Sequence, residues 1–302
     1  MSSDQGGLVK RETGIQDLDA VTRGGLPARG ATLIMGNAGA GKTVLGLQIL
    51  ANAVAAGEGG VYVSFEESRE GIHRGAASFD WGQALMASDR ASIIDARPPP
   101  SADAAGGFDL AGLTAIAEQQ AEALNAHWVV LDGIDRLLGL QPDAHAALAE
   151  IERLRQWCDQ AGLSLIFTGK AGVQDGTNGY FEGIEYLLDT VLVLSARLAN
   201  NRLNRRFRIA KYRGTSHVTH ELAMVMGDDG IHLGYEDVTN QEIASVSSER
   251  VGTGIERLDD VLGGGVHKGS TVLISGLPGT SKTTLAASFA AAAGERGERV
   301  LY

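Results

Sequence analysis

The sequence predicts an α/β fold in which a mostly parallel central sheet is flanked by helices and followed by a C-terminal antiparallel extension. Up to about residue 189, strand-like apolar runs alternate with helix-like segments. That alternation is typical of parallel strands joined by helical crossovers. From Thr190 onward, strand patterns follow one another through short turns. Consecutive strands joined by tight turns favour antiparallel pairing.

An internal repeat predicts the domain organisation. Residues 13–62 match residues 253–302 without a gap at 20 of 50 positions, 240 residues apart. We expect a first domain over residues 1–240, a polar linker over 241–250 and the N-terminal part of a second domain over 251–302. The second part contains too few strands to cover an apolar face, so we expect it to be partly ordered at best.

The elements follow from apolar periodicity and from turn residues. Helical spacing covers residues 15–21, 41–56, 109–125 and 144–162, the last closed by Gly162. Short runs rich in β-formers predict strands at residues 31–36, 61–65, 91–96, 127–132, 163–169, 189–195, 206–213, 221–227 and 230–234. Pro and Gly keep residues 97–107 open as a loop.

A glycine-rich segment, GNAGAGKT, joins the first of these strands to the helix behind it, from Gly36 to Thr43. Glycines let successive backbone N–H groups face phosphate oxygens, and the helix N-terminus adds the positive end of its dipole. Lys42 would reach the β- and γ-phosphates, and the Thr43 hydroxyl would bind Mg²⁺. The segment therefore predicts a site for ATP and Mg²⁺.

The repeat carries a second such loop, GLPGTSKT, from Gly276 to Thr283. Ser281 stands where the first loop has Gly41, and a Cβ there would matter if the position needs a positive φ. Nucleotide contacts are still expected from Gly279, Thr280, Ser281, Lys282, Thr283 and Thr284, with Thr283 also as a metal ligand. Catalysis by this second site is not expected, since no acid-tipped strand follows it.

Acidic residues follow two of the predicted parallel strands. Glu66 and Glu67 follow the strand at 61–65, and Asp132 ends the strand at 127–132. Ligands gather at the carboxyl ends of parallel strands, so these glutamates are candidates for activating water and Asp132 for holding Mg²⁺, with Glu66 also beside the metal. The alternative for the glutamates is a solvated turn. Asp135 is expected to cap or pair structurally.

The run KYRGTSH, from Lys211 to His217, is the other concentration of functional side chains. It is either a basic strand end without a role or, in a ring, a source of Lys211 and Arg213 fingers for a neighbour's nucleotide. Three arginines before it, Arg202, Arg205 and Arg206, are interpreted as a solvated hairpin.

Composition excludes several classes of protein. The formal charge of −11 argues against a surface built for duplex DNA. One cysteine, Cys158, excludes an internal disulfide framework and is expected to be buried and inert. The N-terminus is polar and no apolar run of about 18 residues occurs. We therefore expect a cytoplasmic protein with no membrane contact.

The segments TGIQDLD, GNAGAGKT, VYVSFEES, GGFDL, VVLDGID and above all KYRGTSH resemble the KaiC family of RecA-superfamily ATPases over residues 10–302. The resemblance implies a RecA-like P-loop NTPase fold and a homo-hexameric ring that binds ATP between subunits. It implies nucleotide contacts by Gly39, Ala40, Gly41, Lys42, Thr43, Val44, Ser78, Asp228, Lys211, Tyr212, Arg213, Thr215 and His217. It also makes Glu66 and Glu67 the hydrolytic pair, and the loop after Asp95 the region that receives a KaiB partner in clock members.

Two departures from the family pattern stand out. Gly133 replaces a hydroxyl residue after Asp132, and Ser281 alters the second loop. Serine/threonine autokinase activity belongs to a complete second domain in this family, so it is expected only in a full-length parent. Two other functions remain open: a DNA-handling RecA/RadA-type ATPase, and a non-hydrolysing scaffold cemented by nucleotide. The segment 169–189, with one lysine and four acids, has the wrong composition for binding single strands.

Overall fold

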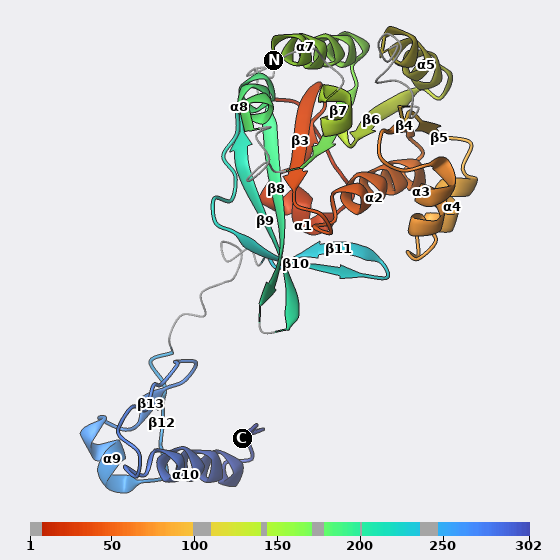
Figure 1. The fold of residues 1–302 in the computed structure, drawn as a ribbon. Coiled ribbons are helices and arrows are strands. Elements are labelled where there is room, and N and C mark those ends of the chain that lie inside the picture. The colour runs from red at the N-terminus through yellow and green to blue at the C-terminus, as the bar shows by residue number, and fades with distance from the viewer. Residues whose placement is uncertain (1–7, 99–109, 140–143, 171–177, 200, 236–246) are drawn as a thin grey trace, which may run out of the picture. The chain divides into compact units, whose positions relative to one another are not determined.

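The computed structural model describes residues 8–98, 110–139, 144–170, 178–199, 201–235 and 247–302. Its contacts divide the chain after Tyr235 into two compact units. The first unit is built on one large sheet with helices on both faces (Figure 1). Among the described residues, no helix combines the length and the apolar character needed to cross a bilayer.

The sheet of the first unit has nine strands in the order β11-β10-β9-β8-β3-β7-β6-β4-β5. Their bounds are β3 Gly30–Gly36, β4 Gly59–Ser64, β5 Ala91–Asp95, β6 Ala126–Asp132, β7 Ser164–Gly169, β8 Thr190–Ala199, β9 Arg202–Tyr212, β10 Leu222–Gly227 and β11 Gly230–Leu233. Strands β8, β3, β7, β6, β4 and β5 run parallel, and β9 to β11 continue antiparallel from β8. The predicted fold class is confirmed.

Helices cover both faces of this sheet. Their bounds are α1 Gln16–Val21, α2 Lys42–Ala55, α3 Arg69–Ala76, α4 Gly82–Ala87, α5 Leu110–Ala123, α6 Ile134–Leu138, α7 Ala144–Ala161 and α8 Asn178–Leu187. A short ladder, β1 Lys10–Arg11 with β2 Leu26–Pro27, precedes the sheet. Side chains of the strands alternate between two cores: Ile34 packs with α1 to α4, whereas Leu33 packs with α5 to α8.

The longer expected elements form close to their predicted bounds. All seven residues of β3 are buried, as expected for a central parallel strand. Gly162 has a φ of 72° and ends the helix α7, since its amide donates to the Asp159 carbonyl. Cys158 is fully buried, and burial raises the pKa of its thiol. The expectation of a buried cysteine is therefore confirmed.

The structure adds elements that the apolar pattern did not indicate. The helices α3, α4, α6 and α8 are short or weakly periodic; α3 begins where the Ser68 hydroxyl accepts a hydrogen bond from the Gly71 amide at 3.1 Å. Strands β8 and β9 extend beyond the predicted bounds because they pair to their ends, up to Ala199 opposite Arg202.

The second unit contains four elements over residues 247–302. They are β12 Arg250–Val251, α9 Glu256–Val261, β13 Val266–His267 and α10 Lys282–Glu295. Residues 271–276, which correspond to β3 in the repeat, form no strand. The Leu273 side chain is 88% exposed, whereas its counterpart Leu33 is fully buried. In this unit the loop and the helix form without a counterpart of β3, and the strands β12 and β13 pair only with each other.

Candidate nucleotide site

The phosphate loop lies between β3 and α2, where a strand turns into a helix over a few residues. Gly39 and Gly41 have φ values of 74° and 104°, which a residue with a Cβ rarely adopts. A Cβ on Gly41 would also lie 2.8 Å from the Met226 methyl group. The Lys42 ammonium donates to the carbonyls of Gly36 at 2.9 Å and Asn37 at 3.3 Å. The lysine is therefore folded over the loop that phosphates would enter.

The other predicted residues of this loop sit at the start of α2. Ala40 is fully buried and donates its amide to the Asn37 carbonyl at 3.2 Å, while Val44 packs against the core on the α2 side. Burial lowers the pKa of Lys42, and the nearby carboxylates of Glu66 and Asp132 oppose that shift. Lys42 thus lies in an environment that favours pairing with an anion.

The hairpin β8–β9 holds the phosphate loop from the side. The Asn37 amide group donates to the Ala196 carbonyl at 2.7 Å and accepts from the Ala196 amide at 2.9 Å. The Arg205 guanidinium donates to the Gly39 carbonyl at 3.3 Å. Arg202 and Arg206 are exposed, as expected for a solvated hairpin, but Arg205 is half-buried and contacts the loop. For Arg205 that interpretation was wrong.

Thr43 and Asp132 bring oxygen atoms together at the first turn of α2. The Thr43 hydroxyl lies 3.2 Å from both carboxylate oxygens of Asp132. The Thr168 hydroxyl donates to the same carboxylate at 2.5 Å and accepts from the Gly133 amide at 3.0 Å. Burial raises the pKa of Asp132, and these hydrogen bonds oppose the shift. A buried carboxylate of this kind gains from a nearby cation.

These oxygens fit a magnesium ion that arrives with phosphates. Mg²⁺ prefers oxygen ligands and is commonly bound by one or two protein oxygens together with substrate phosphates. Thr43 and Asp132 supply such a pair. Over the described ranges, no three His, Cys, Asp or Glu side chains converge as a metal cage.

Glu66 follows β4, and its side chain lies against Gly133 in the loop after β6. A Cβ on Gly133 would lie 2.4 Å from the Glu66 Cγ, and Gly133 has a φ of 81°. A side chain at position 133 would therefore displace Glu66 from the place that it takes in this chain. The Glu66 carboxylate lies 3.0 Å from the Lys170 ammonium.

Glu67 points elsewhere. Its amide donates to the Ser64 hydroxyl at 2.9 Å, and its carboxylate oxygen lies 3.4 Å from the position of a Cβ on Gly71. Glu67 therefore lies over the first turn of α3, a helix N-terminus that favours a negative charge. The two glutamates occupy different surroundings, and Glu66 is the one on the side of Asp132.

Ser78 and Asp228 belong to segments that meet. The Ser78 hydroxyl donates to the Gly75 carbonyl at 2.7 Å just after α3. Two residues later, the Asp80 amide donates to the Asp228 carbonyl at 2.9 Å, in the turn between β10 and β11. The Gln48 side chain ties this β10–β11 hairpin to α2 through the Ile231 amide at 2.7 Å.

The KYRGTSH run lies at the opposite end of the sheet from the phosphate loop. Tyr212 pairs with Thr190, and Thr190 pairs with Thr32 near the start of β3, whereas the loop follows the end of β3. Gly36 lies four positions beyond Thr32 along β3, which corresponds to roughly 13 Å at about 3.3 Å per residue. The structure therefore does not bring this run to the phosphate loop of its own chain.

Four side chains of the run, those of Lys211, Tyr212, Arg213 and Thr215, have hydrogen-bond partners within the first unit. The Lys211 ammonium donates to the carbonyls of Glu185 and Leu188, and the Arg213 guanidinium donates to the Tyr186 carbonyl at 2.5 Å. Both cations thus cap the C-terminal end of α8. The Tyr212 hydroxyl donates to the Gly25 carbonyl at 2.7 Å, and the Lys10 ammonium donates to the Thr215 hydroxyl at 3.0 Å. The centroid of the His217 ring lies 6.4 Å from that of the Tyr212 ring.

In the second loop, local geometry is retained. Ser281 has a φ of 58° and Gly41 one of 104°, so this position has a positive φ in both copies, the condition under which a Cβ matters. The Lys282 ammonium donates to the carbonyls of Gly276 at 2.9 Å and Leu277 at 2.8 Å. The Thr280 hydroxyl donates to the Leu277 carbonyl, and Gly279 has a φ of 85°. Thr283 and Thr284 lie in the first turn of α10.

Lys170, Asn37 and Arg205 were missed as site residues. Lys170 directly follows the buried strand β7, and a charged residue at the carboxyl end of a parallel strand is the signal that could have identified it. Asn37 and Arg205 act through pairing of distant segments, which no local pattern indicates.

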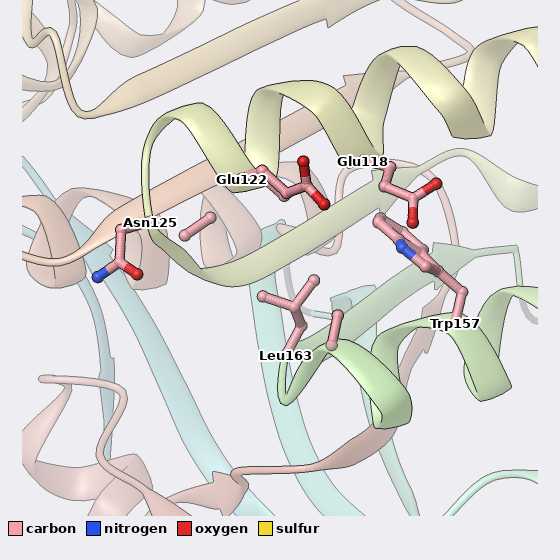
Figure 2. Close-up of a pocket in the computed structure, with 8 residues that line it drawn as sticks. Glu118, Glu122, Asn125, Trp157 and Leu163 are labelled. Atoms are coloured by element: carbon pink, nitrogen blue, oxygen red, sulfur yellow. The ribbon is translucent and has the colours of Figure 1, made fainter.

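A cavity of about 310 Å³ lies away from this site, between α5 and α7 (Figure 2). Asn125 and Leu163, which line it, precede the parallel strands β6 and β7, so it opens at the edge opposite the phosphate loop. It contains no predicted site residue. The loop after Asp95 lies mostly outside the described residues; within them, Asp95 pairs with Arg97 at 2.8 Å.

The fold and this loop define a P-loop ATPase of RecA-like architecture. The chain matches the family model described as "ATPase: KaiC" over residues 11–237 and 251–302. It is 37% identical over 300 residues to the circadian clock protein KaiC2 of Synechocystis sp., which covers 98% of this chain. It is 35% and 32% identical, each over 305 residues and 99% of the chain, to the circadian clock oscillator proteins KaiC of Parasynechococcus marenigrum and Parathermosynechococcus lividus.

The chain therefore belongs to the KaiC family of ATPases. It spans 52% of the length of the KaiC2 relative and 59% and 56% of the two KaiC relatives. The match resumes at residue 251, so both copies of the repeat resemble the same family model.

Proposed function

We propose that the first unit binds Mg-ATP and hydrolyses it to ADP and phosphate. One observation carries the proposal: Thr43, on the first turn after the phosphate loop, lies 3.2 Å from the buried carboxylate of Asp132. This arrangement of oxygens is the one that P-loop ATPases use beside their phosphates. Membership in a family of ATPases supports the same activity.

The residues have separate tasks in this proposal. Backbone amides of residues 39–44 bind the phosphates, and Lys42 leaves the carbonyls of Gly36 and Asn37 to pair with phosphate oxygens. Thr43 and Asp132 hold Mg²⁺, which neutralises charge on the β- and γ-phosphates. Glu66, next to Asp132, orients the attacking water and accepts its proton. Glu67 supports the turn that carries Glu66.

We propose that the nucleotide lies between subunits of a homo-hexameric ring. Lys211 and Arg213 lie at the edge of the sheet opposite their own phosphate loop. They can serve a nucleotide only by reaching the loop of another copy, where Tyr212, Thr215 and His217 would accompany them. Ser78 and Asp228 would complete the site from the chain that supplies the loop. The caps on α8 would then be exchanged for contacts to the γ-phosphate.

The test compares turnover by residues 1–302 with turnover by a Glu66→Gln variant, which keeps the shape of the side chain but cannot accept a proton. We expect kcat to fall at least about 100-fold. Glu70→Gln, on the exposed side of α3, is the matched control and should retain turnover. Full activity in Glu66→Gln would contradict the assignment of Glu66. Turnover would at the same time exclude a scaffold that only binds nucleotide.

Native mass spectrometry tests the ring. We expect six subunits with Mg-ATP and fewer without it, and Lys211→Ala with Arg213→Ala should abolish the shift. A monomer under both conditions would contradict a ring formed by this chain.

Further roles are proposed for a longer protein that includes this chain. Two of the relatives named above are circadian clock oscillator proteins, so a KaiB-like partner at the loop after Asp95 and serine/threonine autokinase activity in a complete second domain are both proposed. A reducing compartment such as the cytoplasm suits the single buried thiol of Cys158.

A further inference from the structure

Lys170 occupies a central position at the edge of the sheet that carries the site. Strand β7 lies between β3, which leads to the phosphate loop, and β6, which ends in Asp132. Lys170 is the first residue after β7. The next strand beyond β6 is β4, which leads to Glu66. The sheet order therefore sets this lysine among the groups proposed to act on ATP.

Lys170 is held on one side and contacts Glu66 on the other. Its backbone amide donates to the Asp135 carboxylate at 3.2 Å, and its ammonium lies 3.5 Å from the same carboxylate. The ammonium also lies 3.0 Å from Glu66 Oε1. Asp135 in turn sits in the first turn of α6, directly behind the loop that contains Gly133. Asp135 thus fixes Lys170 by two contacts, and Lys170 reaches across to Glu66.

Glu66 needs such a partner because it lies on an exposed turn. A glutamate side chain that is free to rotate loses conformational entropy when it is fixed. Two features restrict it: its Cγ lies over Gly133, and its carboxylate meets Lys170. Within the described ranges, Lys170 is the cation in contact with that carboxylate. Removing the ammonium leaves only the packing on Gly133.

We propose that Lys170 is a positioning residue that holds the Glu66 carboxylate where it meets the attacking water, with Asp135 as its anchor. The inference rests on the proposed hydrolysis of ATP by Glu66. A small displacement of a group that orients water costs much of its effect. Lys170 acts on the rate through the location of Glu66 and leaves nucleotide binding to the phosphate loop.

The kinetic test uses Lys170→Met, which keeps the length of the side chain without its charge. We expect kcat for ATP to fall roughly ten-fold while KM changes less than about two-fold. Lys170→Arg should restore kcat to within about three-fold, since it supplies a donor at the same position. Lys268→Met is the matched control, because Lys268 forms a similar ion pair with Glu249 at 3.1 Å in the second unit. It should leave kcat unchanged.

A double-mutant cycle with Glu66→Gln separates two ways in which Lys170 could act. If Lys170 works through Glu66, Lys170→Met should lower kcat less than about two-fold in the Glu66→Gln background. An equal ten-fold loss in both backgrounds would mean that Lys170 contacts the phosphates directly, which overturns the positioning role. Full turnover by Glu66→Gln alone would instead overturn the proposed function.

A second measurement needs no nucleotide. In the full chain labelled with ¹³C at glutamate carboxyls, the Glu66 signal is identified by its loss in Glu66→Gln. We expect Lys170→Met to shift and broaden this signal, Asp135→Asn to shift it less, and Lys268→Met to leave it unchanged. An unshifted Glu66 signal in Lys170→Met would overturn the inference whatever the rate of hydrolysis.

Discussion

The two copies of the repeat share a sequence and a set of local structures but differ in burial. Residues 13–62 form part of a nine-stranded sheet, whereas residues 253–302 form loops, helices and the two-residue strand β13, which pairs with β12. Eight residues of α2 are buried, compared with Ala293 alone in α10. The comparison separates what a segment forms by itself from what it forms only with partners.

The phosphate loop and the hydrogen-bonded turn before the first helix are structures that a segment forms by itself. In each copy the ammonium of the loop lysine donates to the backbone carbonyls of the residues six and five positions earlier in the chain. In each copy the residue directly before the helix also has a positive φ. In each copy a threonine amide donates to the aspartate six residues later, Thr13 to Asp19 at 2.8 Å and Thr253 to Asp259 at 2.7 Å. These contacts span a few residues, so they do not require the rest of a domain.

Strands belong to the second class. β3 exists because β7 and β8 supply hydrogen bonds on both sides of it, whereas residues 271–276 have no such neighbours in the described chain. Burial also reverses the direction in which the pKa of the capping aspartate is shifted. It raises the pKa of Asp19, whereas Asp259, which is not buried, has its pKa lowered by the hydrogen bonds from Thr253. The hydrogen bonds from the threonine lower the pKa in both copies, but at Asp19 burial outweighs them.

The largest expected difference between the copies is in turnover. Lys42→Met removes the cation at the phosphate loop and should lower kcat at least about 100-fold, because the lysine neutralises phosphate charge. Lys282→Met is the same change in the second loop and should leave turnover of residues 1–302 within about two-fold, since among the described residues no carboxylate bonds to Thr283 as Asp132 does to Thr43. Steady-state ATPase assays measure both. An equal loss in the two variants would mean that the second loop also takes part in hydrolysis.

The next difference concerns stability. Leu33→Ala in β3 leaves a cavity in a fully buried site and should lower the free energy of unfolding of the first unit by about 3 kcal/mol. Its counterpart Leu273→Ala, with the leucine 88% exposed, should change stability by less than about 0.5 kcal/mol. All three tryptophans lie in the first unit, so their fluorescence follows its unfolding. Hydrogen exchange of α10 follows the second unit.

A marked loss of protection in α10 on Leu273→Ala would contradict this part of the comparison. It would show that residues 271–276 are covered in solution. The control for unspecific loss is Val261→Ala, since Val261 is also exposed, at 83%, but lies outside the segment that corresponds to β3.

The sequence predicted the parts of the fold that depend on local periodicity and on buried strands. The parallel core, the antiparallel extension and the phosphate loop all follow from runs such as residues 31–36 and 127–132. Short helices such as α4 and α6 were missed, because six or five residues show little periodicity. Their formation depends on packing against the sheet.

For the candidate site, the sequence identified residues of the right chemistry but not which of them lie together. Glu66 and Glu67 are adjacent in sequence, yet one lies over Gly133 and the other over the first turn of α3. The role of Lys170 was not predicted because its partners, Glu66 and Asp135, follow two different strands, β4 and β6. Only the sheet order brings the three together. Lys211 and Arg213 could not be assigned to an edge before the register of β8 and β9 was known.

The smallest expected difference lies at the residue before each helix. Ser281 adopts a φ of 58°, which costs an L-residue roughly 1 to 2 kcal/mol relative to glycine. Ser281→Gly should therefore stabilise the start of α10, by about 1 kcal/mol, and slow hydrogen exchange of the amides that follow. The reverse change, Gly41→Ser, should cost more, because φ is 104° and a Cβ would meet the Met226 methyl at 2.8 Å.

The cost of Gly41→Ser is measured by thermal unfolding and by the affinity for nucleotide. Gly41→Ala, which adds the Cβ without a hydroxyl, distinguishes a backbone effect from a new hydrogen bond, and both variants should lose stability alike. If Gly41→Ser were as stable as the wild type, the loop would tolerate a side chain at this φ. The difference between Gly41 and Ser281 would then be neutral, and the lower burial of the second unit would follow from its missing strands alone.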